Sequence, residues 1–247
     1  PVAEDVFTHF PGLKGDQPLL YVAFMTFVLI MSSVTMVLAV NAGHQLKRNV
    51  TAWWMVATII GGGIFVSSQA WEWYHFIIGD KGAIELSTSE VMKVANRDGN
   101  VLSLSQIVQG MDKGHSANHE LLFSDEEVFE SIRANNNLVL QSPGKDHTPF
   151  NREATIKALD GAHVIQGANM YHNEYGKQQF ANFFFFITGF HGFHVFSGVV
   201  LNVMVFYNVM LGTYDRRKTY GMVEKVGLYW HFVDLVWVFV FTFFYLV

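Results

Sequence analysis

Two long apolar stretches near the end of the sequence decide its fold class. Residues 180–211 read FANFFFFITGFHGFHVFSGVVLNVMVFYNVML, and residues 228–247 read LYWHFVDLVWVFVFTFFYLV. Each is long enough to cross a lipid bilayer, which takes about 20 predominantly apolar residues in a helix. Each also carries ionisable side chains, which are costly in hydrocarbon and are therefore expected to face the interior of a helical bundle. These side chains are His191 and His194 in the first stretch and His231 and Asp234 in the second.

Two further spans are predicted upstream, at residues 19–40 and 52–78. The first has small hydroxyl residues and the second a run of glycines at 61–63, both of which favour close helix packing. The second span ends in QAWEWYH (residues 69–75), whose aromatic residues are typical of a membrane–water interface. In this stretch Glu72 and His75 lie three residues apart and so share a helix face.

Residues 79–177 interrupt the apolar pattern and separate the two pairs of spans. From residue 80 to residue 177 there are nine Lys and Arg against fourteen Asp and Glu. This segment is too long for a simple connection, so we expect a small extramembrane domain or a partly ordered loop. Short helices are predicted at 103–112 and 124–135, the second capped by Ser124 and followed by acidic residues in its first turn.

The composition supports a membrane protein. The chain has 247 residues, is 51% hydrophobic and 15% aromatic, and carries a formal net charge of −5. Because there is no cysteine, disulfides, iron–sulfur clusters and thiolate metal sites are excluded. The mild acidity gives no reason to expect nucleic acid as a partner. We therefore predict an all-α membrane protein with four transmembrane helices in a bundle. Its parts are a lead-in at 1–18, helices 1 and 2 within 19–78, an extramembrane insert of roughly 95 residues at 79–177, and helices 3 and 4 within 178–247.

The orientation follows from the charges of the short loops. Residues 41–51 and 212–227 are both net basic, and short basic loops stay on the cytoplasmic side. The lead-in, the insert and the C-terminus are then expected on the outer, periplasmic side of a bacterial inner membrane.

Three interpretations of the polar groups in the spans stay open at this point: a paired polar seam between helices, a proton relay, and a metal site. Steps of three and four residues place two sets on common helix faces, which are His191, His194, Gly198, Asn202 and His231, Asp234, Val238, Thr242. At about 1.5 Å per residue, Glu72 lies roughly 30 Å and His231 about 5 Å from the inner ends of their spans. They therefore should not share one site, whereas Asp234 could meet His191 or His194. The seam is the favoured interpretation, because intramembrane polar groups pair with one another.

A second candidate metal pair lies in the insert, where His115 and His119 are four residues apart. They could bind a metal if that piece is helical. A solvated loop is the favoured interpretation, because a short histidine spacing without a third ligand is weak evidence.

The two C-terminal motifs carry a family resemblance. ITGFHGFHVFSG (187–198), followed by YWHFVDLVWVFVF (229–241), resembles subunit III of the haem-copper terminal oxidases, the cytochrome c oxidase family. LIMSSVTMVLAVNAGHQLKRN (29–49) and SSQAWEWYHF (67–76) resemble the family's preceding pair of helices. The resemblance therefore extends over all four predicted spans.

The resemblance implies a non-redox subunit of an oxygen-reducing, proton-pumping enzyme. In that family haem and copper lie in subunits I and II, and subunit III packs against subunit I, binds phospholipid and supports sustained proton uptake and resistance to inactivation during turnover. No catalytic residue, cofactor or metal is then expected in this chain. By match, five residues are recurrent polar positions with internal packing and hydrogen-bonding roles: Glu72, His191, His194, His231 and Asp234.

Two departures from the family pattern shape the expected partners. Family members have seven spans, or five in shorter bacterial forms, and this sequence lacks the span with the S-E-V-x-F-F carboxylate, so proton-linked roles tied to that group are in doubt. We expect a separate chain to supply the missing helices. The insert at 79–177 replaces a short family loop and could contact a cytochrome c domain, a donor complex or an accessory subunit. A quinol oxidase subunit, a small membrane transporter and a metal-dependent membrane enzyme stay as alternatives.

Overall fold

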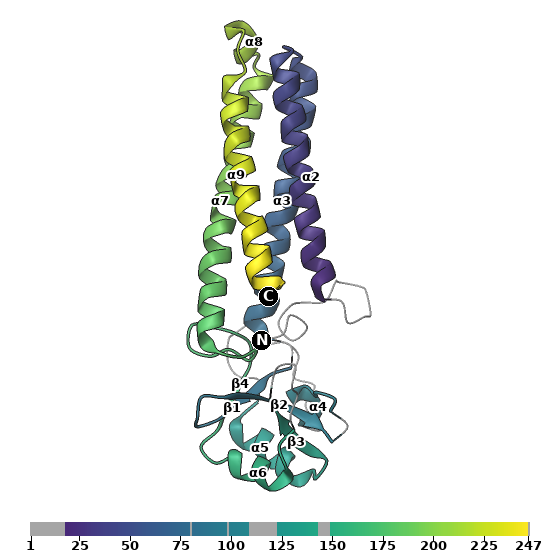
Figure 1. Cartoon of the computed structure of the whole chain (residues 1–247), viewed down its shortest axis with the longest axis vertical. Coiled ribbons are helices and arrows are strands. Elements are labelled where there is room, and N and C mark those ends of the chain that lie inside the picture. The colour runs from purple at the N-terminus through teal and green to yellow at the C-terminus, as the bar shows by residue number, and fades with distance from the viewer. Residues whose placement is uncertain (1–17, 80, 98, 109–122, 143–148, 247) are drawn as a thin grey trace. The chain divides into compact units, whose positions relative to one another are not determined.

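The computed structural model describes residues 18–79, 81–97, 99–108, 123–142 and 149–246. Four of its helices are long and apolar enough to cross a membrane, and they run side by side in Figure 1. They are α2 (Pro18–His44), α3 (Arg48–Ile78), α7 (Gln178–Met210) and α9 (Gly221–Tyr245). The prediction of four transmembrane helices is confirmed. Among the described residues, one compact unit runs from Glu72 to Phe183, and the other combines 18–71 with 184–246.

The helices extend beyond the apolar stretches that predicted them. The turn between α2 and α3 is limited to residues 45–47, where a loop of 41–51 was expected. Helix α9 begins at Gly221, seven residues before the predicted start of the fourth span. His231 therefore lies about 15 Å along its helix rather than about 5 Å. The physical reason is that an apolar run marks the hydrocarbon-embedded part of a helix, whereas polar residues such as Glu224 continue the same helix outside it.

Both short connections lie at one end of the bundle. The Arg48 guanidinium, at the start of α3, donates a hydrogen bond to the carbonyl of Met210 at the end of α7. The second connection forms a short helix, α8 (Thr213–Arg217), and Tyr220 donates to the Asp215 carboxylate at 2.5 Å. Burial and this carboxylate raise the pKa of Tyr220 above its usual range, so its phenol stays neutral. The expectation that the two basic connections share a side is confirmed.

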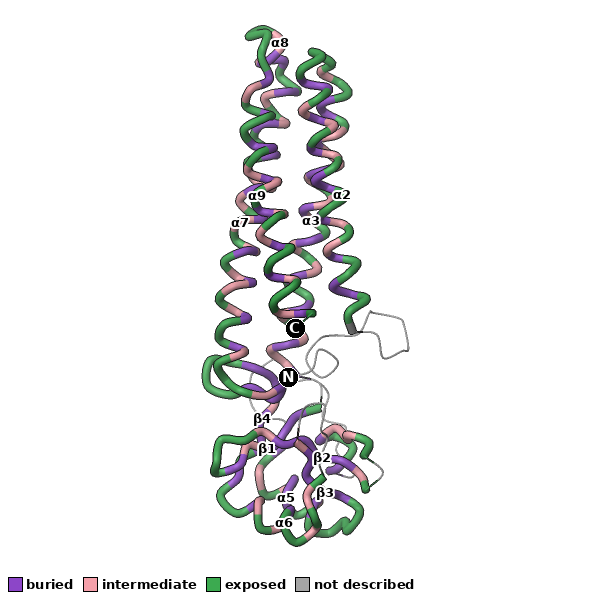
Figure 2. Tube along the Cα trace, in the orientation of Figure 1, coloured by how far each residue is buried: buried purple, intermediate pink, exposed green. Residues whose placement is uncertain are grey.

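Each long helix buries a stripe of residues spaced alternately by three and four positions (Figure 2). A repeat averaging 3.5 residues is the pattern of helices that pack side by side at a shallow left-handed angle. The stripes contain residues 22, 25, 29, 32, 36 and 39 of α2; 55, 58, 62, 65 and 69 of α3; 188, 191, 195, 198, 202, 205 and 209 of α7; and 223, 226, 230, 233, 237 and 240 of α9.

The bundle keeps its buried polar residues in a mainly apolar interior and exposes large apolar side chains on its outer faces. Large apolar side chains such as Phe27, Phe186 and Phe243 are mostly exposed on the outer faces. Buried polar residues lie on the stripes instead, among them Ser32, Thr58, Gln69, Thr188 and Asn202. This is the distribution expected when the surrounding solvent is lipid, because only polar groups gain by turning away from it.

The insert contains a four-stranded antiparallel sheet in the order β3-β2-β1-β4. Its strands are β1 (Ala83–Glu85), β2 (Val91–Asn96), β3 (Leu138–Gln141) and β4 (His163–Ile165). Ile84 pairs with Met92 on one side and with Val164 on the other, and Val94 pairs with Leu140. The sequence predicted only short helices here, so the sheet is an unpredicted element within a mainly helical protein.

Three short helices accompany the sheet: α4 (Leu104–Ile107), α5 (Asp125–Ala134) and α6 (Arg152–Ala158). The predicted cap of α5 is confirmed, since the Ser124 hydroxyl accepts from the Glu127 amide at 3.3 Å and the Glu127 carboxylate accepts from the Ser124 amide at 3.1 Å. Val128, Phe129 and Ile132 of α5 join the sheet residues in one hydrophobic core. The described part of the insert is therefore a packed domain with its own core.

A tight backbone contact joins the insert to the last turn of α3. The Ala168 amide donates to the Phe76 carbonyl at 3.1 Å, and the Phe76 ring stacks on Tyr175 with 4.8 Å between centroids. Gly167 has φ +71°, and a Cβ there would lie 2.0 Å from the Ile77 carbonyl oxygen. The Gly167 amide donates to the buried Glu174 carboxylate at 2.5 Å. Only glycine fits this approach.

Candidate functional site

Trp230 of α9 contacts all three other long helices. Its indole lies between two glycines: a Cβ on Gly62 of α3 would come within 2.5 Å of its ring, and one on Gly198 of α7 within 3.0 Å. The indole N–H donates to the Ser32 hydroxyl of α2 at 3.1 Å. Gly61 approaches Ser32 in the same way, whereas a Cβ on Gly63 would have nothing within 4 Å. Close packing, as predicted for this glycine run, applies to its first two members.

A second indole repeats this arrangement two turns further along α9. The Trp237 N–H donates to the Thr26 hydroxyl of α2 at 3.0 Å, and its ring meets Phe65 of α3 edge-on with 4.7 Å between centroids. The ring of His191 from α7 lies 5.1 Å from Trp237. His191 is buried, and its Nε2 donates to the Val233 carbonyl of α9 at 3.1 Å. His191 is therefore a hydrogen-bonding link between α7 and α9.

The other two polar residues of α9 face α2. His231 Nδ1 lies 2.6 Å from the Ser33 hydroxyl of α2. Asp234 lies one turn further along α9, near Ser33 and His231. The alternative from the sequence, Asp234 beside His191 or His194, is not the arrangement found.

His194 lies beside the buried stripe of α7 rather than on it. Its Nδ1–H donates to the Phe190 carbonyl of its own helix at 2.8 Å, and its ring is 4.5 Å from the Phe190 ring. His191 and His194 both line a cavity of about 210 Å³ that is otherwise apolar. His194 is half-buried, so it does not share the interior position of His191.

The predicted polar face of α9 turns outward after Asp234. Val238 and Thr242 are exposed, and the interior stripe runs instead through Trp230, Val233 and Trp237. On the face shared by 231, 234, 238 and 242, the first two residues are half-buried and the last two are exposed. The signal that sequence reasoning missed is the pair of mid-span tryptophans, whose indole N–H groups need acceptors inside the bundle.

We call the interhelical contacts of Trp230, Trp237, His191 and the Asp234–Ser33–His231 group the polar seam. Four hydrogen bonds of the polar seam join α9 to α2 or to α7. Glu72 is also buried, and it continues the stripe of α3 between Gln69 and Phe76.

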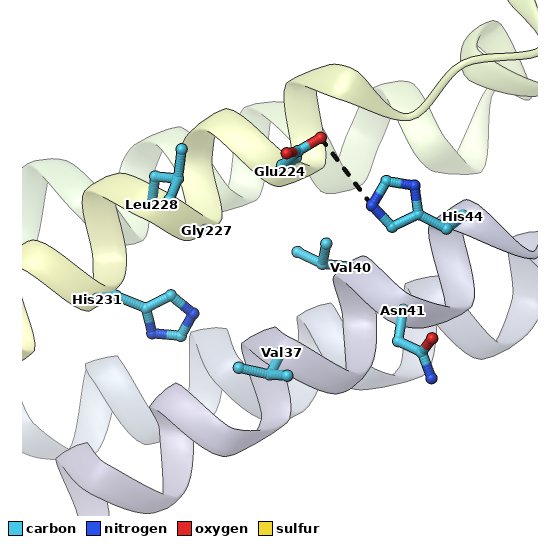
Figure 3. A pocket seen from close by; sticks show the side chains of 8 residues that line it. All are labelled: Val37, Val40, Asn41, His44, Glu224, Gly227, Leu228 and His231. Atoms are coloured by element: carbon cyan, nitrogen blue, oxygen red, sulfur yellow. Dashed lines mark ion pairs between the residues drawn. The ribbon is translucent and has the colours of Figure 1, made fainter.

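A groove of about 260 Å³ lies between α2 and α9 beside the seam. Figure 3 shows His44 and Glu224 facing each other at one end, His231 at the other, and Val37 and Val40 between them. His44 Nε2 is 4.0 Å from the Glu224 carboxylate, and both side chains are about half exposed. Glu224 and His231 are seven residues apart, about 10 Å along the helix, so they do not form a direct hydrogen-bonded chain.

Among the described residues, no group of three or more His, Asp or Glu side chains lies close enough to hold a metal ion. The insert pair His115 and His119 falls outside the described residues. The geometry at hand defines a multi-pass helical membrane protein whose interior polar side chains hold its helices together.

Comparison with known proteins shows a family similarity in the C-terminal third of the chain. The family model "Cytochrome c oxidase subunit III" matches residues 163–247, which include all of α7 and α9. Cytochrome c oxidase subunit 3 of Thermostichus vulcanus is 44% identical over 68 residues, 27% of this chain and 33% of that protein. The Synechocystis sp. protein of the same name is 46% identical over 68 residues, 27% and 29% of the two chains. The probable cytochrome c oxidase subunit 3 of Rickettsia prowazekii is 34% identical over 86 residues, 34% and 31%.

The C-terminal third of the chain, residues 163–247, is similar to the cytochrome c oxidase subunit III family. It spans about a third of the length of the curated relatives it matches. The matched range includes four of the five predicted polar positions, His191, His194, His231 and Asp234, and excludes Glu72. The resemblance noted for α2 and α3 lies outside this range.

Proposed function

We propose that the chain acts as the non-redox subunit III of a proton-pumping haem-copper oxygen reductase, most directly a cytochrome c oxidase. The observation that carries this proposal is the match over α7 and α9, the two helices that also supply most of the polar seam. Relatives that match the same region are named as cytochrome c oxidase subunit 3.

The seam supports a structural role for the five predicted polar positions. His191 and His231 make hydrogen bonds that fix α9 against α7 and α2, which keeps the outer faces in a defined arrangement. Glu72, His194 and Asp234 are proposed to act in the same way, as packing and hydrogen-bonding groups. A subunit that holds its shape in this manner can pack against subunit I and support sustained proton uptake there.

The redox chemistry is proposed to reside in partner chains. Haem and copper belong to subunits I and II in this assignment, and no step of electron transfer is assigned to this chain. Phospholipid is the proposed non-protein partner, and the apolar outer faces and the groove between α2 and α9 offer surfaces for acyl chains.

Further partner and topology proposals accompany this function. The chain lies in a bacterial inner membrane with the insert and the C-terminus on the periplasmic side, since its short loops are basic. On that side the insert would be available to a cytochrome c domain or another donor. A quinol donor is the second candidate, because nothing in this chain distinguishes the two.

The experiment that tests this function compares membranes from cells with and without the chain. Oxygen consumption with excess reductant is recorded over successive turnovers, with the haem content of each membrane as the reference. We expect membranes that lack the chain to lose oxidase activity progressively faster during turnover, or to fail to assemble the haem-containing subunits. Equal initial rates, equal haem content and equal lifetimes in the two membranes would contradict the proposal.

A further inference from the structure

The segment between β4 and α7 ends in a small hairpin with an unusual tip. Ala168 and Asn173 form an antiparallel bridge, and the Asn169 amide donates to the His172 carbonyl at 2.8 Å. Met170 and Tyr171 therefore occupy the two central positions of the turn. They are 74% and 77% exposed, among the most exposed large side chains of the described protein. Gly, Asn, Asp, Pro and Ser normally dominate such positions, so local turn chemistry does not explain this Met-Tyr pair.

The tip is held firmly in its exposed position. The Asn169 side-chain oxygen accepts from the amides of Tyr171 and His172, both at 2.7 Å. His172 Nδ1 lies 2.9 Å from the Glu85 carboxylate of β1, which ties the turn to the sheet. The Gln178 side chain donates to the Met170 carbonyl at 2.5 Å, which ties it to the first residue of α7. The presentation of Met170 and Tyr171 is therefore built into the fold.

The same hydrogen bond places the tip beside the first residue of α7. Gln178 begins α7, and the exposed apolar surface of that helix begins at Phe183, about 7.5 Å further along the axis. This distance is comparable to the depth of the headgroup region of a leaflet, about 5–7 Å. Tyr74, half exposed near the end of α3, belongs to the same compact unit and is also suited to this zone.

We infer that Met170 and Tyr171 form a membrane anchor that inserts into the lipid headgroup zone beside α7. Tyrosine suits this zone because its ring is apolar and its hydroxyl is polar. The exposed Lys177 can face lipid phosphate next to it. A protein partner is less consistent with the size of the patch. A large side chain buries roughly 150–250 Å², so two supply less than the roughly 800 Å² per side of a stable protein interface.

The absence of cysteine in the sequence permits a direct test by site-directed spin labelling. Tyr171→Cys is introduced, labelled with a nitroxide and reconstituted, within its native complex, in phosphatidylcholine and phosphatidylglycerol vesicles. Collision rates with oxygen, which concentrates in lipid, and with a water-soluble nickel chelate are measured. Glu130→Cys, on the exposed side of α5, is the matched control. Wild-type complex labelled in parallel supplies the background from partner chains.

The inference predicts a markedly higher ratio of oxygen to nickel collisions at position 171 than at position 130. Equal, nickel-dominated ratios at the two positions would overturn it, since the tip would then lie in water. Low collision rates with both reagents at 171 would also overturn it, since a protein would then cover the tip. The inference requires only that α7 crosses the membrane, so it can fail or succeed independently of the oxidase assignment.

Discussion

Trp230 is the residue on which the arrangement of the four helices most depends. It is 1% exposed, it fills the space left by Gly62 and Gly198, and its N–H has an acceptor on α2. In a membrane there is little hydrophobic driving force between helices, so close packing and interhelical hydrogen bonds determine how they associate. One large side chain that combines both kinds of contact therefore fixes the relative positions of three neighbours.

The first prediction concerns the space around this indole. Gly62→Ala places a methyl group 2.5 Å from the Trp230 ring and 2.7 Å from Val199, so the helices must separate. We expect a loss of roughly 1–3 kcal/mol in the free energy of unfolding, as for overpacked cores. Gly63→Ala is the control, because nothing lies within 4 Å of its new methyl group. Thermal unfolding of the purified complex, followed by size-exclusion of the detergent-solubilised protein, measures the difference.

Gly63→Ala is expected to leave stability unchanged or to raise it by up to about 1 kcal/mol, through its helix propensity. Equal effects of the two substitutions would show that Gly62 is not at a packing contact and that the position of Trp230 is wrong.

At the residue scale, the sequence identified the polar residues within the spans, but it did not identify the residues that their side chains contact. The positions of His191, His231 and Asp234 within spans were evident, because ionisable groups stand out in apolar stretches. Their partners were not evident, since a transmembrane helix is apolar on every side and its pattern does not mark the interior face. The small hydroxyl residues of the first span were expected to favour packing, and one of them, Ser33, is the hydrogen-bond partner of His231.

At the scale of elements, the join between α3 and the insert is the most constrained feature. Gly167 lets the last part of the insert approach the Ile77 carbonyl, and Glu174 accepts the Gly167 amide beside it. Tyr175 stacks on Phe76 in the same place. These contacts fix the insert to a helix end through backbone atoms, which leaves little tolerance for a larger side chain.

The second prediction separates this close approach from backbone strain. Gly161 and Gly167 both have φ +71°, so alanine at either position incurs about 1–2 kcal/mol of left-handed strain. Only Gly167→Ala adds a clash, because its Cβ would lie 2.0 Å from the Ile77 oxygen, whereas at 161 the nearest atom is 3.8 Å away. We expect Gly167→Ala to expose the insert to limited proteolysis and Gly161→Ala to keep it resistant. Equal cleavage of both variants would argue against a tight join.

The sheet of the insert could not be predicted from the sequence. Its strands have three to six residues, and β2 buries its four central residues instead of alternating. Neither feature produces the period-two pattern that predicts a strand. Helix α5 was predictable because Ser124 and the acidic residues after it form a local cap, whereas the sheet depends on pairings between residues far apart in sequence, such as Val94 with Leu140.

At the scale of the whole molecule, an apolar exterior and a hydrogen-bonded interior describe a chain adapted to lipid and to neighbouring subunits. The family model matches the half of the bundle that contains α7 and α9. Of the insert, only residues 163–177 lie in the matched range. We propose that catalysis belongs to partner chains and that this chain supports their assembly. The number of transmembrane helices was predictable from hydropathy alone, while the family assignment depended on the motifs around His191 and His231.

The most direct test of this account is purification of the tagged chain from its native membrane under gentle conditions, with an absorption spectrum and intact masses of everything that accompanies it. We predict haem a-type bands together with two large subunits in this preparation. A stable, homogeneous preparation of this chain alone, free of haem and copper, would contradict the oxidase assignment.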